Sequence, residues 1–252
     1  MKRWLIGLSL TGALIIGGSA FVTWAQPPIN DDPRRFSNTQ EWDETLLPYL
    51  VENLATPTRI ETEEYLAGIT LPPPPTPAET VAELAPLHEY ARVEREAVQT
   101  DIEAEVYVSN LRWGDFVYGN NDKPHTTELL LAAREHILRI VMTLKRDYDR
   151  VRPSFFDSTL TTSVEVPGHP AYPSGHASEA YVNAFILSHL DQVHRDAYES
   201  DAARIARNRE IAGVHYPSDS EAGGLLAEQF VPLFLASKEG QTLLSAAREE
   251  WE

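Results

Sequence analysis

The segment Ala171-Tyr172-Pro173-Ser174-Gly175-His176 lies where an irregular, proline-containing stretch gives way to a helical pattern. A proline and a glycine two positions apart, followed by apolar residues at helical spacing, predict a turn that opens a helix at about residue 175. The backbone N–H groups of Ser174, Gly175 and His176 would then lie at a helix N-terminus, which favours anions. An ordinary junction between a loop and a helix has the same pattern, so this segment alone does not establish a site.

Helical periodicity extends to most of the chain around this segment. Apolar residues recur every three or four positions over 77–108, from 124 to a stop before Pro153, and over 175–190, 196–213, 218–237 and 239–251. Thr126 or Thr127 is expected to cap the second of these helices, and Pro153 to end it. Residues 109–123 and 154–172 are expected to be loops. Because strand signals are nearly absent, the sequence predicts an all-α domain.

Residues 1–25 have the pattern of an export signal. Lys2 and Arg3 precede an apolar stretch over 4–22, and Thr23-Trp24-Ala25 is an acceptable cleavage site. The alternative is an uncleaved membrane anchor, since the stretch is long enough to span a bilayer. Either way the rest of the protein is expected outside the cytoplasm, periplasmic or secreted, and no second stretch is apolar enough to cross a membrane.

Residues 26–64 are polar and are expected to form a partly flexible lead-in, with a short helix over 44–54 that Pro48 interrupts. The proline-rich segment 71–77 excludes a helix or a central strand. It predicts an extended polyproline strap along the domain surface, although a linker or a partner motif would have the same composition. We expect the folded domain to cover residues 65–252.

Composition limits the classes of function. The chain has 252 residues and a formal net charge of −17, which argues against a nucleic-acid partner. An anionic substrate would be repelled at long range, so an anion site requires a local cluster of Lys and Arg. The absence of cysteine excludes disulfides, thiolate metal sites and cysteine nucleophiles.

Two basic residues upstream of the opening segment, Lys145 and Arg152, are seven positions apart. On a helix this spacing is two turns, which would place both side chains on one face. There an arginine can grip an oxyanion with two hydrogen bonds while a lysine adds a point charge. Most such pairs are simply solvated surface residues, so the pair needs support from elsewhere in the chain.

Downstream, Arg209 is followed by His215 and, four positions later, by Asp219. If the turn at Pro217 lets these two side chains meet, Asp219 can accept the imidazole N–H and leave the other ring nitrogen free to attack. Taken alone, a histidine with an aspartate nearby is more often structural. The sequence therefore predicts a site only if the three segments act together.

Together the three segments resemble the signature of the type 2 phosphatidic acid phosphatase and vanadium haloperoxidase superfamily: Lys, six residues, Arg-Pro; Pro-Ser-Gly-His; and Ser-Arg, five residues, His, three residues, Asp. The one departure is Asn208, where the family usually has Ser. The resemblance covers about Tyr65 to the C-terminus and is most like the class A bacterial acid phosphatases, which share a signal peptide, a Leu-Pro-Pro-Pro-Pro segment and a single compact helical bundle domain.

The resemblance implies that His215 attacks phosphorus and becomes a phosphohistidine, that Asp219 orients it, and that His176 protonates the leaving alkoxide and later activates water. It also implies that five residues hold the phosphate oxygens: Lys145, Arg152, Ser174, Gly175 and Arg209. Since side-chain cations would neutralise the transition state, no metal or other cofactor is expected, and vanadate is expected to bind as a phosphate mimic. Activity should survive chelators and follow a bell-shaped pH profile on the acid side.

The expected activity is broad-specificity acid phosphatase, with a small phosphate ester as substrate, no nucleic-acid partner, and no membrane partner unless the amino-terminal segment is retained. A homo-oligomer is left open. The main alternative is a vanadium haloperoxidase with His215 as the axial vanadate ligand, although such enzymes are usually much larger and commonly carry one more residue between Lys and Arg-Pro. The second alternative is a catalytically retired phosphate-binding envelope protein, although both histidines are present.

The remaining histidines are expected to have structural or solvent-exposed positions. His136 is on an apolar helix face and is expected in the core or at its rim, and four others are expected to be exposed: His88, His125, His189 and His194. His169 precedes Pro173 and is a candidate for the pocket wall. Glu179, one turn after His176, is a candidate for tuning the site but is expected at the surface.

Overall fold

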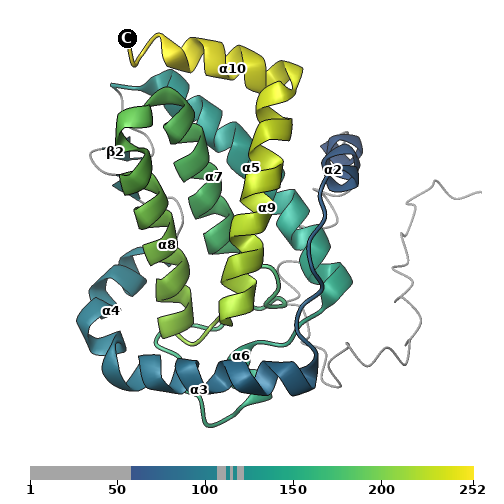
Figure 1. Ribbon diagram of the computed structural model, residues 1–252, viewed down its shortest axis with the longest axis vertical. Coiled ribbons are helices and arrows are strands. Elements are labelled where there is room, and N and C mark those ends of the chain that lie inside the picture. Colours follow the sequence, from purple (N-terminus) through teal and green to yellow (C-terminus); the bar gives the residue numbers. More distant parts are fainter. Residues whose placement is uncertain (1–57, 107–111, 114–115, 118–121) are drawn as a thin grey trace, which may run out of the picture. The chain divides into compact units, whose positions relative to one another are not determined.

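The computed structural model describes residues 58–106, 112–113, 116–117 and 122–252 (Figure 1). The predicted all-α class is confirmed: within these residues the only strands are a two-residue antiparallel pair, β1 (Arg112–Trp113) and β2 (Phe116–Val117). The helices are α2 (Thr58–Ala67), α3 (Pro77–Val93), α4 (Arg95–Ala104), α5 (Pro124–Tyr148), α6 (Pro153–Phe156), α7 (Gly175–Leu190), the short 3₁₀ turn η2 (Gln192–His194), α8 (Arg195–Ile211), α9 (Pro217–Ala236) and α10 (Lys238–Arg248).

Some of the sequence predictions lie outside the described residues. These are the export signal or anchor over 1–25, most of the polar lead-in, the short helix over 44–54 and most of the loop over 109–123. Helix α2 begins at Thr58, within the segment assigned to the lead-in. Among the described helices, none combines the length and the apolar character that a membrane span needs.

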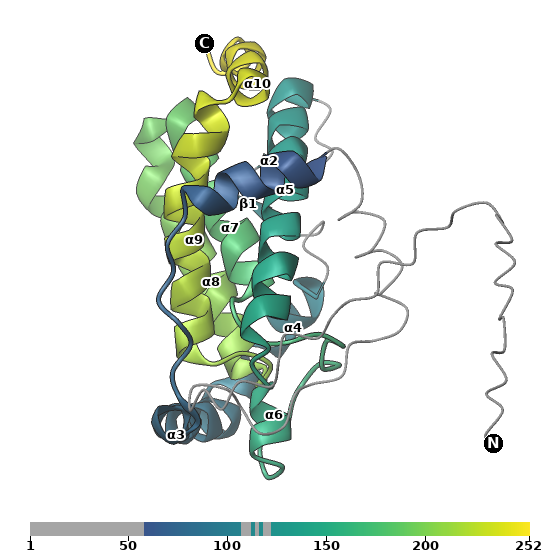
Figure 2. The same ribbon diagram turned by 90° about the vertical axis from the view of Figure 1, so that its right-hand side faces the viewer.

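Helix α7 lies at the centre of the bundle and packs against α5, α8 and α9 (Figures 1 and 2). It is buried on several faces, because Val182, Ile186 and Leu187 all have no exposed surface although they point in different directions around the helix. A helix covered on all sides is apolar all round and shows little amphipathic pattern. At the N-terminus of α7, Ser174 is buried, whereas Gly175 and His176 are half-buried.

Gly223 lets α9 approach the first turn of α7. A Cβ atom at this position would lie 2.8 Å from the Cβ of Ala177 and 2.9 Å from the carbonyl oxygen of Ser174. The close approach also allows the N–H of Ser174 to donate to the carbonyl oxygen of Asp219 at 3.0 Å. The start of α9 is thus fixed directly against the N-terminus of α7.

Helix α5 begins at Pro124, and neither Thr126 nor Thr127 is its cap, so that prediction was wrong. Proline is well suited to the first helical position because its missing N–H has no partner there. The carboxylate of Glu250 accepts the N–H groups of His125 at 2.7 Å and Thr126 at 2.8 Å. The tail after α10 therefore satisfies the start of α5, which no local pattern indicates.

Helix α5 ends at Tyr148, before the stop expected at Pro153, because Asp149 adopts a left-handed conformation with φ of 47°. Left-handed residues commonly terminate helices. Lys145 is in the last turn, whereas Arg152 lies beyond the helix as the N-cap of α6. The two side chains do not share one helix face, which corrects that expectation.

The helix predicted over 77–108 is divided at Glu94 into α3 and α4, which Figure 1 shows turned away from each other. Tertiary contacts account for the break. Arg95 donates to the carbonyl oxygens of Ile211 at 2.9 Å and Thr161 at 2.8 Å, and Arg207 pairs with Glu94 at 2.9 Å. These contacts draw α4 toward the end of α8 and override the local helical pattern.

Residues 69–76, between α2 and α3, form neither helix nor strand, in agreement with the polyproline prediction. The segment runs beside α9 (Figure 2), where Gln229 holds both backbone groups of Thr70 at 2.9 and 3.0 Å. Leu71 is buried, and the hydroxyl of Tyr172 donates to the carbonyl oxygen of Pro72 at 2.5 Å. The strap is therefore tied to the loop that leads into α7.

Candidate active site

The candidate site lies where the ends of several helices meet. It is formed by the N-termini of α7 and α9, the C-termini of α5 and α8, and the segment between α5 and α6. The turn from α8 to α9 depends on Gly213, whose φ is +78° and whose Cβ, if present, would lie 2.9 Å from the carbonyl oxygen of Thr161. Only glycine adopts such a conformation without strain, so this turn sets how His215 follows α8.

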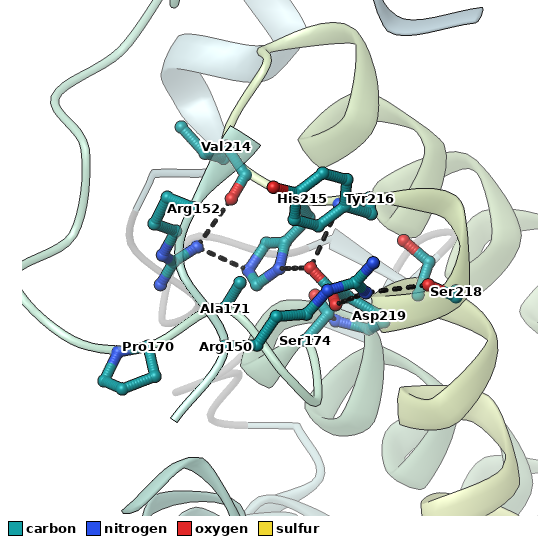
Figure 3. A network of polar contacts seen from close by, with 12 residues as sticks. Arg150, Arg152, Pro170, Ala171, Ser174, Val214, His215, Tyr216, Ser218 and Asp219 are labelled. Atoms are coloured by element: carbon teal, nitrogen blue, oxygen red, sulfur yellow. Dashed lines mark hydrogen bonds and ion pairs between the residues drawn. The ribbon is translucent and has the colours of Figure 1, made fainter. Parts of the chain in front are cut away.

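His215 and Asp219 are in contact, as their spacing allowed. The Oδ2 atom of Asp219 accepts the Nδ1–H of His215 at 3.1 Å and the backbone N–H of Tyr216 at 3.0 Å (Figure 3). Asp219 has no exposed surface, and His215 has 2%. The carboxylate therefore fixes both the orientation of the ring and the nitrogen that carries the proton.

Arg152 occupies the opposite side of the ring. Its Nη1 atom lies 2.9 Å from Nε2 of His215 and 2.7 Å from the carbonyl oxygen of Val214 (Figure 3). A guanidinium group can only donate, so Nε2 is the acceptor. The imidazole is neutral, with its lone pair directed toward a cation.

The pKa of His215 is well below its ordinary value. Burial is the largest cause, and the positive charges of Arg152, Lys145 and Arg209 add to it in that order. The pKa shift and the hydrogen bonds agree, since both require a neutral ring. A neutral imidazole, whose Nε2 carries a lone pair and no proton, is the form that can act as a nucleophile.

Three buried cations surround this ring, and none forms an ion pair with a carboxylate of the described residues. Lys145 donates to the carbonyl oxygens of Pro170 and Ala171, both at 2.8 Å. Burial lowers the pKa of Lys145, and it lowers that of Arg152 to about 9. Each of these groups is held by neutral carbonyls, so its charge is not compensated within its own contacts.

Arg209, in the last turn of α8, is the least satisfied of the three. It is 2% exposed, and its Nε and Nη1 atoms make no hydrogen bond within the described part of the chain. Burial lowers its pKa to about 10, although Glu105 opposes the shift. Burying an unpaired donor is costly, so this arrangement is best explained by an anionic ligand.

The expected donors at the start of α7 are only partly placed as predicted. Ser174 is the N-cap, and its Oγ atom accepts the N–H of Ala177 at 3.4 Å. Its own backbone N–H is already used by Asp219 at 3.0 Å, which corrects the expectation that it points at an anion. Gly175 begins the helix, and the positive end of the helix dipole remains directed at this region.

His176 lies in the first turn of α7 and is half-buried. Its Nε2 atom donates to the carbonyl oxygens of Glu105 at 3.0 Å and Val106 at 3.2 Å. Burial, followed by the charge of Arg209, lowers the pKa of His176 to about 3. The ring is therefore neutral in the ligand-free protein, with its proton on Nε2.

Two buried groups near the site were not expected from the sequence. Arg150 is fully buried and contacts Oδ1 of Asp219 at 2.5 Å. Glu105 is buried at the end of α4, pairs with Arg204, and accepts from Nδ2 of Asn208 at 2.9 Å. The departure from the family pattern at Asn208 thus supports Glu105. Both groups are joined to partners distant in sequence, so no short motif marks them.

The secondary candidates have mixed outcomes. His169 lies beside Arg152, with 3.1 Å between its Nδ1 and Nη2 of the arginine. Glu179, expected at the surface, is buried and pairs with Arg134 at 2.8 Å, and burial raises its pKa to about 7. His136 is buried as expected, 2.9 Å from Glu239. His88, His125, His189 and His194 are at least partly exposed, although His88 contacts Asp157.

The site combines a neutral imidazole, buried cations without a carboxylate ion pair among the described residues, and a helix N-terminus. These are the groups that binding of an oxyanion requires. No family model matches the sequence. Over 111 residues the chain is 27% identical to a non-specific acid phosphatase of Providencia stuartii, covering 42% of this chain and 45% of that protein. The chain thus matches less than half the length of this relative. The match agrees with the resemblance to bacterial acid phosphatases that the three motifs indicated.

Two solved structures are similar at low sequence identity. A bacterial vanadium-dependent iodoperoxidase is 15% identical, with a TM-score of 0.48 over 73% of this chain and 52% of that one. A transmembrane phosphatidylglycerolphosphate phosphatase of Bacillus subtilis is 17% identical, with a TM-score of 0.36 over 75% of this chain and 92% of that one. Both TM-scores are below 0.5.

Proposed function

We propose that this protein is a metal-independent phosphomonoester hydrolase that acts through a phosphohistidine at His215. The observation that carries the proposal is the buried guanidinium of Arg209, whose Nε and Nη1 atoms make no hydrogen bond within the described residues. Beside it lies a neutral His215 whose acceptor nitrogen faces Arg152. A phosphate group would supply the missing charge and the missing hydrogen-bond acceptors at once. The similarity to a non-specific acid phosphatase supports the same class of substrate.

In the proposed first step, the lone pair of His215 Nε2 attacks phosphorus while the bond between phosphorus and the ester oxygen breaks. Arg152 now donates to Nε2 at 2.9 Å, so the substrate's phosphate oxygens must take over this donor as phosphorus approaches. Asp219 holds the Nδ1 proton and stabilises the positive charge that develops on the ring. Lys145 and Arg209 offset the charge on the equatorial oxygens.

His176 is proposed to give a proton to the leaving alkoxide, and then to take one from the water that attacks the phosphohistidine. This second attack breaks the nitrogen–phosphorus bond and releases phosphate. The low pKa of His176, about 3 in the ligand-free protein, arises from burial and then from Arg209. A bound phosphate dianion would neutralise the second cause and raise the pKa, so substrate binding would itself prepare the acid.

The test is hydrolysis of a chromogenic aryl phosphate at mildly acid pH with EDTA present, comparing wild type, His215→Ala and His194→Ala. His194 is exposed, and its ring contacts Asp191 and Tyr198, away from the candidate site, so it is a matched control. We expect activity in the wild type and control, and none in His215→Ala. Rapid quenching followed by peptide mass analysis should place a phosphoryl group on His215.

Three results would contradict the proposal. The first is hydrolysis that EDTA abolishes and a metal ion restores. The second is full activity in His215→Ala. The third is peroxide-dependent oxidation of bromide in the presence of vanadate, with no ester hydrolysis, which would instead favour the haloperoxidase alternative.

A further inference from the structure

Arg150 is a fully buried cation that the proposed mechanism does not use. It directly follows Asp149, whose left-handed conformation ends α5 and turns the chain inward. Its carbonyl oxygen accepts the N–H of Ala171 at 2.7 Å. The backbone of Arg150 is therefore tied to the loop before α7, while its side chain extends toward α9 (Figure 3).

The guanidinium joins α3 to α9. Its Nη1 atom donates to Oδ1 of Asp219 at 2.5 Å and to the hydroxyl of Ser218 at 2.7 Å. Its Nη2 atom donates to Glu83 at 2.6 Å and to Thr80 at 3.1 Å. The plane of the group also lies 3.9 Å from the ring centroid of Tyr216. Hydrogen bonds from both terminal nitrogens and the ring stacked on its face hold the guanidinium in one orientation.

The two oxygens of Asp219 have separate partners. Oδ1 is held by Arg150, and Oδ2 accepts from His215 and from the backbone of Tyr216. A carboxylate fixed at one oxygen cannot rotate about its last bond, so the direction of the other oxygen is also set. Arg150 thus acts on the ring of His215 through Asp219, without touching it.

The charge of Glu83 affects the net charge around Asp219. Arg150 carries one positive charge and contacts two carboxylates, so Glu83, Arg150 and Asp219 together have a net charge of −1. Burial would lower the pKa of Arg150, but Asp219 and Glu83 outweigh it and raise the pKa. Because Glu83 shares the cation, Asp219 keeps its negative field at His215 although an arginine is bound to it.

We propose that Arg150, held in place by Glu83, is a positioning residue that aligns Asp219 with His215 and sets the balance of charge at the nucleophile. This inference rests on the proposed phosphatase function. The charged and titratable groups that act directly on His215 are Asp219, Arg152, Lys145, Arg209, His176 and His169. Arg150 and Glu83 lie behind these groups. The positive charge of Arg150 lowers the pKa of His215, and the negative charge of Glu83 raises it.

The experiment compares Arg150→Met, Arg150→Lys and Glu83→Gln with Arg207→Met as the matched control. Arg207 also links α8 to the α3–α4 region, through Glu94 and Tyr90, but has no contact with Asp219. For each folded variant, kcat and KM are measured against pH, and the pKa of His215 is read from histidine side-chain ¹⁵N NMR without substrate. The NMR titration does not depend on turnover, so failure of the phosphatase proposal and failure of this inference are distinguishable.

Removing the charge of Arg150 leaves the buried carboxylate of Asp219 and the partly exposed carboxylate of Glu83 without their shared cation, which favours protonated His215. In Arg150→Met we therefore expect the pKa of His215 and the acidic limb of kcat/KM to move to higher pH, with kcat reduced on the order of 100-fold through misalignment. Glu83→Gln removes a negative charge and should move the pKa of His215 and the acidic limb of kcat/KM to lower values. Arg150→Lys keeps the charge and should leave the limb near its wild-type position with a smaller loss of kcat.

A role in stability alone would lower the amount of folded enzyme equally at every pH and would leave the limb in place. If Arg150→Met folds and both the limb and the pKa of His215 are unchanged, the inference is wrong. Should Arg150→Met fail to fold, Glu83→Gln and Arg150→Lys carry the test. In Glu83→Gln, an unchanged limb or a shift to higher pH overturns the inference as well. In Arg150→Lys, a clear shift of the limb away from its wild-type position does the same.

Discussion

At the scale of single residues, Arg209 combines a cost in stability with a use in function. Its buried Nε and Nη1 atoms have no partner within the described residues, and burial lowers its pKa to about 10. We expect Arg209→Met to leave the thermal midpoint unchanged or raised, because the unpaired donors are removed. The same change should lower kcat/KM by about 100-fold or more, as loss of one oxyanion donor does elsewhere.

The ligand dependence of stability separates this effect from general damage. Inorganic phosphate or vanadate should raise the thermal midpoint of the wild type and have little effect on Arg209→Met. Arg209 is also the second cause, after burial, of the low pKa of His176. Its removal should therefore move the alkaline limb of activity to higher pH. A variant that unfolds at lower temperature and still responds fully to phosphate would contradict this account of Arg209.

Some contacts of the site residues can be predicted from the sequence, and others cannot. The contact between His215 and Asp219 was accessible, because residues four apart at a helix start can meet. The link from Arg150 to Glu83 was not, since 67 positions separate them and the motif that spans Arg150 does not specify the residue at this position. The hydrogen bond that uses the N–H of Ser174 was hidden for the same reason, because its acceptor is on another helix.

At the scale of elements, two adjacent glycines of α9 provide a matched pair. A Cβ on Gly223 would meet Ala177 at 2.8 Å and the backbone of Ser174 at 2.9 Å, whereas one on Gly224 would meet the ring of Tyr181 at 3.3 Å. Gly223→Ala should destabilise the fold by about 1–3 kcal/mol and reduce activity, because α9 carries Asp219 away from α7. Gly224→Ala should be neutral or stabilising by up to about 1 kcal/mol, since a side-chain ring can move.

Thermal or urea unfolding of the two variants, with activity assayed on the folded protein, gives the comparison. Equal effects of the two substitutions would show that the spacing between α7 and α9 does not matter in the way we describe. Neither glycine is itself assigned to phosphate binding, so each substitution acts through the distance between two helices.

Helix positions were predictable where local signals are strong. Helices α7, α8, α9 and α10 begin and end close to the predicted limits, because proline, glycine and helical periodicity mark their boundaries. The break at Glu94 and the early end of α5 depend on contacts of Arg95 and on the conformation of Asp149. These features depend on contacts between residues far apart in the sequence, so a local sequence pattern does not predict them.

At the scale of the whole molecule, the chain has a net charge of −17 yet holds Lys145, Arg152 and Arg209 inside the fold without carboxylate partners among the described residues. The carboxylates at the protein surface do not compensate these buried cations, because solvent ions screen the field of surface charges beyond about one Debye length. In the ligand-free protein, Lys145, Arg152 and Arg209 therefore repel one another. An anion relieves this repulsion, which connects stability to occupancy of the site.

That connection predicts how the molecule responds to acid. The folded-state pKa of His176, about 3, is below the unfolded value of about 6.5, and the pKa of His215 is also lowered. Unfolded chains then bind more protons, so stability is complete above about pH 6.5 and falls as the pH decreases toward 3. We expect the thermal midpoint to decrease over this range without phosphate, and to decrease less with phosphate bound. A His176→Asn variant should show a shallower dependence. A midpoint that does not change between pH 7 and pH 4, or that phosphate leaves unaffected, would mean that burial and the surrounding cations do not hold these histidines neutral.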